Sequence, residues 1–110
     1  MKITYDPNKR EKTLIERGLD FESAATLFAG RVFEIEDTRQ DYGERRILCF
    51  GELNGRLLVV GYVQRGDNRH VFSMRKANDR EISRYANRLV QSGRPFHPAG
   101  RVPGAAGVDR

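Results

Sequence analysis

The sequence predicts an α+β fold with two N-terminal helices, an antiparallel β-meander and one C-terminal helix. Three observations lead to this class. Apolar residues follow a helical spacing before residue 30, and three β-like stretches lie between residues 46 and 76. A capping pattern then starts at Asn78, immediately after the last of these stretches. Helices and strands are therefore segregated along the chain rather than alternating.

The N-terminal part predicts a short β-like segment followed by two helices. Residues 2–5 are the β-like segment. Asp6 suits a helix N-cap and Pro7 the first helical position, so the first helix should run from Pro7 to about Arg17 and end at Gly18. The second helix should be capped by Asp20 and end at Gly30. Its apolar positions have the spacing i, i+3, i+4 and i+7, and they are Phe21, Ala24, Ala25 and Phe28.

The middle of the chain predicts a sheet. Residues 32–35 form a short strand, and the polar segment 37–44 forms a loop. Asn54-Gly55 is typical of a type I′ hairpin turn. The expected meander therefore has its strands at residues 46–53, 56–65 and 69–76.

The C-terminal part predicts one helix and a tail. Asn78 and Glu81 match a capping box, and the apolar stripe of the helix begins with Ile82 and Tyr85. From residue 92 onward the chain is rich in Gly and Pro and lacks periodicity. We therefore expect a single domain over residues 1–91 and a disordered tail over residues 92–110.

Composition narrows the function classes. The 110 residues carry a net charge of +5, which favours an acidic partner such as nucleic acid. The single Cys49 excludes an intramolecular disulfide, and it lies in an apolar run where a buried, inert thiol is expected. His70 and His97 are the only histidines and lie outside any metal-ligand spacing, so we expect no metal. No apolar run is long enough for a membrane span, so we expect a soluble, cytoplasmic protein without membrane contact.

The expected strand 69–76 carries the main candidate site. Strict alternation divides it into one face with Arg69, Val71, Ser73 and Arg75 and another with His70, Phe72, Met74 and Lys76. Phe72 and Met74 are the bulkier apolar pair, so the second face should pack on the core. Arg69, Ser73 and Arg75 would then share the open face, where two guanidinium groups can grip a phosphate. The alternative is an ordinary strand with a solvated polar face.

These residue types suit metal-free RNA cleavage. Such a reaction needs a base for the 2′-hydroxyl, cations for the charge on the phosphate, and an acid for the leaving oxygen. The candidate cations are Arg46, Arg69, Arg75 and Lys76, and the candidate proton carriers are Glu22, Glu44, His70, Glu81 and Tyr85. Each of them alone is more often an ordinary surface residue. The residues by themselves therefore predict a small basic α+β domain and a candidate RNA binder.

Several motifs follow one another between residues 2 and 86. The chain opens with the aromatic-Asp-Pro-x-Lys pattern of residues 5–9, continues with Gly18 and the Phe-Glu-x-Ala pattern of residues 21–24, and follows the hairpin through residues 43–46 and 55–60. The most specific part is Ser73-Met74-Arg75-Lys76-Ala77, followed by Arg80-Glu81 and Tyr85. In this order the motifs resemble those of the BrnT toxins of type II toxin–antitoxin systems.

The resemblance implies an endoribonuclease toxin with a RelE-like fold that acts without a metal or other cofactor and slows translation. It also implies a BrnA-type antitoxin with a ribbon-helix-helix domain, through which the complex binds operator DNA. The candidate catalytic residues are Glu22, Arg69, His70, Ser73 and Arg75. The candidate RNA-binding residues are Arg17, Arg46, Lys76 and Arg80. The alternative function is a non-catalytic RNA- or protein-binding module, such as an inactivated toxin.

The chain departs from the commonest pattern of that family at two positions. Arg17 stands before Gly18 where many members have His, and His70 stands in the last strand where many members have Arg. One hypothesis is a paired exchange that keeps one residue of each kind in the same region. The other is two unrelated changes.

Overall fold

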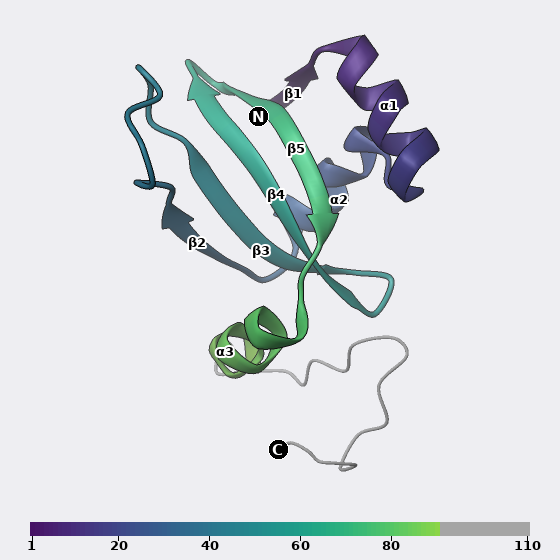
Figure 1. Ribbon diagram of the computed structural model, residues 1–110, viewed down its shortest axis with the longest axis vertical. Helices are drawn as coiled ribbons and strands as arrows, with labels where there is room; N and C mark the ends of the chain where they lie inside the picture. Colours follow the sequence, from purple (N-terminus) through teal and green to yellow (C-terminus); the bar gives the residue numbers. More distant parts are fainter. Residues whose placement is uncertain (91–110) are drawn as a thin grey trace.

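The computed structural model describes residues 1–90, which form one mixed five-stranded sheet and its covering helices (Figure 1). The strand order is β1-β5-β4-β3-β2. The predicted α+β class is confirmed. The elements in chain order are β1 (Lys2–Tyr5), α1 (Pro7–Arg17), the 3₁₀ turn η1 (Phe21–Ser23), α2 (Ala24–Ala29), β2 (Val32–Glu36), β3 (Ile47–Leu53), β4 (Arg56–Arg65), β5 (Asn68–Lys76) and α3 (Asp79–Val90).

The first helix has the predicted ends. The side chain of Asp6 accepts a hydrogen bond from the Asn8 backbone N–H, and Pro7 occupies the first turn. At the other end Gly18 has a φ of 69°, and its N–H donates to the Leu14 carbonyl. The second helix is shorter than predicted, because its first three residues form η1 and α2 only begins at Ala24.

The sheet contains the predicted meander and two more strands. β3, β4 and β5 pair antiparallel in sequence order, and β2 adds an antiparallel edge next to β3. β1 pairs parallel with β5, which makes the sheet mixed. The sequence predicted only the antiparallel part of this sheet. The parallel pair was not predicted, because β1 and β5 lie more than 60 residues apart and no local pattern indicates their pairing.

Two cores lie on opposite sides of the sheet. On the side that we call the α2 face, Phe21, Ala24, Leu27 and Phe28 pack against inward residues such as Cys49 and Val60. On the other side, the α3 face, Ile82 and Tyr85 pack against Phe33, Phe50 and Val59. Figure 1 shows α3 crossing below one end of the sheet while α2 lies behind it. α3 is therefore the sole helix among the described residues that packs on its side of the sheet.

A β-bulge in β5 changes which side chains share a face. Gly61 of β4 is paired with Ser73, whereas Tyr62, the next residue, is paired with Val71. Phe72 is therefore the extra residue, and the alternation of β5 shifts by one position at this point. Gly61 makes room for the bulge, because a Cβ there would lie 2.5 Å from Ser73 Oγ and 2.6 Å from Phe72 Cζ.

The bulge corrects the predicted core pair of this strand. Val71 and Met74 are the fully buried residues, and both belong to the core of the α2 face. Phe72 is only half-buried and lies on the α3 face beside Gly61. The prediction that Phe72 and Met74 share one face was wrong, because strict alternation does not hold across a bulge.

Two further predictions concern the C-terminal tail and membrane-spanning helices. The expected tail, residues 92–110, lies outside the described residues, so its disorder stays a prediction. Within residues 1–90, no helix is long and apolar enough to cross a membrane.

Candidate functional site

The bulge separates the two arginines that the sequence had placed together. Arg75 follows the bulge and, with its partner Val59, lies on the α3 face. Arg69 precedes the bulge and lies on the α2 face, where its guanidinium stacks on Phe28 and Tyr62. The predicted open face shared by Arg69, Ser73 and Arg75 was therefore wrong for Arg69.

Arg46 instead shares the α3 face with Ser73 and Arg75. Arg46 immediately precedes β3, and its guanidinium carbon lies 4.2 Å from the centre of the Tyr42 ring and 4.5 Å from the centre of the Phe72 ring. A guanidinium stacked between two rings keeps its planar donors in a fixed orientation. Its Nε is buried without a hydrogen-bond partner. This side of the sheet therefore presents one pre-oriented cation between two aromatic rings.

Arg75 is held by a carboxylate. Its Nη1 and Nη2 donate to the two carboxylate oxygens of Glu81 at 2.8 and 2.9 Å, and Nη1 also reaches the Lys76 carbonyl at 3.3 Å. The hydrogen bonds to Glu81 raise the pKa of Arg75 and the same contact lowers the pKa of Glu81, so both groups are charged at neutral pH. The side chain of Arg75 remains 40% exposed. Lys76 and Arg80 lie nearby along the chain, and both are exposed.

His70 lies near the start of β5. It is paired with Val63 of β4 and Thr4 of β1, and its Nδ1 lies 2.9 Å from Thr4 Oγ1. Burial, and next the positive charge of Arg65, lower the pKa of His70 below its ordinary value of 6.5. His70 is therefore neutral at pH 7, which is the form that can accept a proton.

Two predicted residues have partners away from the Arg46 and Arg75 side chains. Glu22, in η1, accepts a short hydrogen bond from the Tyr5 hydroxyl, and η1 packs on the α2 face. Arg17, the last residue of α1, donates from Nη1 to the Met74 carbonyl at 2.9 Å. Since His70 bonds to Thr4, Arg17 and His70 have different partners, which favours two unrelated changes over a paired exchange.

The α2 face holds its own polar cluster around Arg69. Tyr62 donates its hydroxyl proton to Glu34 Oε2 at 2.7 Å, and Arg69 Nη1 lies 3.9 Å from the same oxygen. Burial raises the pKa of Cys49, which lies next to this cluster, to about 12, as expected for an inert thiol. These contacts join β2, β4 and β5, so we interpret the cluster as structural.

The loop between β2 and β3 is organised by Asp37. This buried carboxylate accepts hydrogen bonds from the side chain and backbone of Arg39 and from the Tyr42 hydroxyl, and the Asp37 N–H donates to the Arg46 carbonyl. These contacts place Tyr42 where it can stack on Arg46. Tyr42 and the role of Asp37 were not predicted from the sequence, although an Asp at the start of a polar loop is a recognised turn signal.

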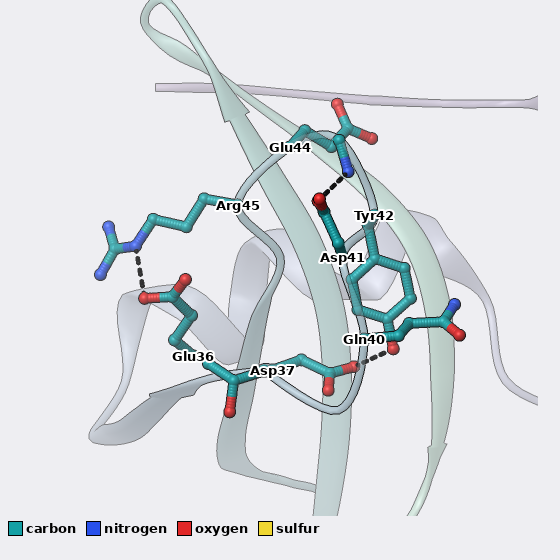
Figure 2. A pocket seen from close by; sticks show the side chains of 9 residues that line it. Glu36, Asp37, Gln40, Asp41, Tyr42, Glu44 and Arg45 are labelled. Atoms are coloured by element: carbon teal, nitrogen blue, oxygen red, sulfur yellow. Dashed lines mark hydrogen bonds and ion pairs between the residues drawn. The ribbon is translucent and has the colours of Figure 1, made fainter.

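Figure 2 shows a shallow hollow inside this loop. Asp37 and Tyr42 lie on one wall, and Glu36 bonds to Arg45 at its edge. The charged groups that line it are mostly acidic: Glu36, Asp37, Asp41 and Glu44 stand against Arg45 alone. The negative charge of the hollow therefore disfavours binding of a phosphate. Within residues 1–90 there is no group of three or more Asp, Glu, His or Cys side chains placed to hold a metal ion.

Comparison with known proteins identifies the family. The family model described as "Ribonuclease toxin, BrnT, of type II toxin-antitoxin system" matches residues 5–81. The chain belongs to the BrnT toxin family. Among solved structures it is similar to the crystal structure of the Brucella abortus ribonuclease toxin BrnT, with 31% identity and a TM-score of 0.54 over 72% of this chain and 99% of that chain. None of the curated proteins matches.

The family assignment confirms the resemblance drawn from the sequence motifs. The mixed sheet with three helices is consistent with the RelE-like fold expected for a BrnT protein. A type II system also implies a protein antitoxin as partner. Only the first three residues of α3 lie inside the match, because the family model ends at Glu81.

Proposed function

We propose that this BrnT-family protein is a metal-independent endoribonuclease whose RNA site lies on the α3 face of the sheet. The observation that carries the proposal is the position of Arg46, stacked between Tyr42 and Phe72 on the same side as Ser73 and Arg75. Cations and aromatic rings on a rigid sheet suit the phosphates and bases of RNA. The ribonuclease toxin family to which the chain belongs supports this function.

In this proposal each group has a role that its environment favours. Arg46 and Arg75 stabilise the charge that develops on the phosphate when the 2′-hydroxyl attacks it. Neutral His70 is the candidate proton carrier on this side, since its pKa is lowered. Ser73 donates a hydrogen bond to a phosphate oxygen. Attack by the 2′-hydroxyl would leave a 2′,3′-cyclic phosphate and a free 5′-hydroxyl.

Three of the remaining residues keep smaller roles. Arg80 is an exposed cation at the start of α3 and contacts RNA in this proposal. Lys76 is exposed at the end of β5, but it is paired with Leu58 of the α2-face core, so it contributes only its positive charge. Arg17 positions β5 through its hydrogen bond to Met74 and does not contact RNA. Glu22 and Arg69 are left out of the proposed site, because their partners lie on the α2 face.

The proposed partner is a BrnA-type antitoxin with a ribbon-helix-helix domain. It would neutralise the toxin, and the complex would bind operator DNA through the antitoxin. Free toxin would slow translation by cutting RNA. Growth arrest on expression of the chain, relieved by co-expression of a neighbouring ribbon-helix-helix gene, tests this part of the proposal.

One observation favours the alternative function of a non-catalytic binding module. Both Nη groups of Arg75 already donate to Glu81, so these two donors are not available for a bidentate contact with a phosphate. In the proposed enzyme, Glu81 orients Arg75, and the partly exposed guanidinium contacts RNA through the donor that Glu81 does not use. In the alternative, the ion pair only attaches α3 to the sheet.

Incubation of the purified chain with total RNA separates the two functions. We expect cleavage that yields 2′,3′-cyclic phosphate ends and is unaffected by EDTA. Intact RNA despite measurable binding would support the binding module. Loss of cleavage in EDTA, restored by magnesium, would refute metal independence.

A further inference from the structure

Helix α3 carries a row of arginines. Arg80, Arg84 and Arg88 follow one another in steps of four, and all three are exposed. A step of four advances about 6 Å along a helix and turns only about 40°, so the three side chains form one stripe. Ile82 and Tyr85, which pack on the sheet, lie on the other side of the helix. Arg80 and Arg84 therefore lie on the outer side of α3, and Arg88 lies at the edge of the core against Phe33.

The stripe is electrostatically unfavourable for the helix itself. Like charges four residues apart repel, and α3 contains two such pairs in succession. The acidic residues of the helix, Asp79 and Glu81, both lie in its first turn, and Glu81 is bonded to Arg75. In α1, by contrast, Lys12 and Glu16 have opposite charges at the same spacing. A repulsion of this kind is relieved when an anionic chain lies along the helix.

Two of these arginines are held in place by aromatic rings. Arg84 lies 5.6 Å from the centre of the Tyr85 ring, and Arg88 lies 4.9 Å from the centre of the Phe33 ring. Stacking of this kind limits the conformations of the guanidinium before a ligand arrives. Arg84 and Arg88 therefore present donors at defined positions on the surface.

The stripe starts next to the proposed RNA site. Arg80 belongs to the same first turn as Glu81, which bonds to Arg75 of β5. From there the helix leads away below the sheet (Figure 1). Arg84 and Arg88 also lie beyond the residues that match the family model, which end at Glu81.

We propose that the Arg80–Arg84–Arg88 stripe binds the phosphate backbone of single-stranded RNA that extends beyond the cleavage site. The inference rests on the proposed function, because it assigns the flanking part of the same substrate. Regularly spaced guanidinium groups along one side of a helix fit an evenly charged polyanion. The stripe makes longer RNA bind more tightly than short RNA.

Binding of 2′-O-methyl uridine oligonucleotides tests this inference without cleavage, because these probes lack the 2′-hydroxyl. The full chain, an Arg84→Ala/Arg88→Ala variant and a Lys2→Ala/Lys12→Ala control would be compared by fluorescence anisotropy at several salt concentrations. The two control lysines are exposed on β1 and α1, outside the proposed site. Probes of about 4 and about 16 nucleotides span the usual site sizes of such proteins.

We expect the α3 variant to bind the long probe roughly tenfold more weakly near 0.1 M salt. The slope of log K against log salt should be shallower by about 1.4, or about 0.7 for each lost contact. The short probe and the lysine control should be unaffected. Alanine is a better helix former and removes the repulsion, so α3 should stay folded, and circular dichroism checks this.

Other outcomes overturn the inference. An unchanged salt slope for the α3 variant would show that the stripe does not contact phosphates. An equal loss for both probes would place the stripe inside the cleavage site rather than beside it. Polyglutamate serves as a second probe in the same assay. If the α3 variant binds polyglutamate more weakly but binds RNA as the full chain does, the stripe binds an acidic protein segment instead. The α3 variant could show the shallower salt slope while the full chain leaves total RNA uncut. That result would support RNA binding by the stripe and refute only the proposed endoribonuclease activity.

Discussion

Arg75 and Glu81 join the end of β5 to the first turn of α3 by a two-point ion pair, with N–O distances of 2.8 and 2.9 Å. The same carboxylate accepts the Asn78 N–H at 3.0 Å, while Asn78 Oδ1 accepts the Glu81 N–H at 2.8 Å. This is the capping box expected from the sequence. One glutamate therefore both starts the helix and orients the arginine of the strand.

The first prediction concerns this pair. We expect Arg75→Ala to reduce RNA cleavage at least a hundredfold, since a charge-assisted donor to a developing oxyanion contributes about 2.7–4 kcal/mol. The loss of stability should be about 1 kcal/mol or less, because the pair is partly exposed. Cleavage assays and urea unfolding measure the two effects.

Two further variants test whether cleavage depends on the orientation of the Arg75 guanidinium or only on its positive charge. Arg75→Lys keeps the charge but loses the planar fork, so it should not restore cleavage. Glu81→Gln keeps the helix and the Arg75 charge but loosens the guanidinium, so it should reduce cleavage less than Arg75→Ala does. If Arg75→Ala unfolds the protein while the folded fraction keeps full activity, Arg75 is structural.

The second prediction compares the two stacked arginines. Arg46 and Arg69 each lie against two aromatic rings, but on opposite faces of the sheet. Arg46→Ala should abolish most RNA cleavage with a small change in melting temperature. Arg69→Ala should lower the melting temperature, because Glu34 loses its neighbouring cation, and should leave cleavage by the folded protein unchanged. If instead Arg69→Ala abolishes cleavage and Arg46→Ala leaves it unchanged, the RNA site lies on the α2 face.

The third prediction follows from the bulge. Met74 is fully buried, so Met74→Ala should cost about 2–5 kcal/mol of unfolding free energy. Phe72 is half-buried beneath Arg46, so Phe72→Ala should cost less stability and instead weaken RNA binding. Denaturant titration of both variants gives the comparison. A larger stability loss for Phe72→Ala would contradict the register assigned to β5.

The fourth prediction concerns acid stability and the Asp37 loop. Hydrogen bonds from Arg39 hold the pKa of Asp37 below its ordinary value of 3.8. A carboxyl group whose pKa is depressed by folding stabilises the protein above its unfolded pKa, and this contribution falls as pH drops below that value. Asp37→Asn should therefore cost roughly 1–3 kcal/mol at neutral pH.

The pH dependence supplies the control for this substitution. The stability difference between the natural protein and Asp37→Asn should shrink at about pH 3, because the carboxyl group of the unfolded chain is then largely protonated while that of the folded protein is still ionised. Thr38→Ala, an exposed neighbour, should leave the profile unchanged. An equal difference at both pH values would show that the carboxylate charge does not stabilise the loop.

Much of the fold was predictable because its signals are local. Asp6, Pro7 and Gly18 mark both ends of α1, and Asn54-Gly55 marks the hairpin turn, where both residues have positive φ. The motifs that resemble BrnT proteins are also contiguous stretches of sequence. They identified the family without any knowledge of the packing.

The faces of β5 depended on tertiary structure. Alternation predicts which side chains share a face only while the strand is regular, and the bulge at Phe72 depends on the space that Gly61 leaves in the neighbouring strand. Arg69 and Arg75 are consequently separated, and Arg46 replaces Arg69 on the face that carries Ser73 and Arg75. Tyr42 likewise becomes part of the candidate site only through the fold of the Asp37 loop.

The sequence by itself determined the class, most of the elements and the toxin family, since capping, turn and motif residues act over a few positions. Tertiary structure alone decided the parallel pairing of β1 with β5 and the side of the sheet on which each arginine lies. Pairing across more than 60 residues and a one-residue shift of register depend on contacts between distant segments, and a local pattern does not encode such contacts.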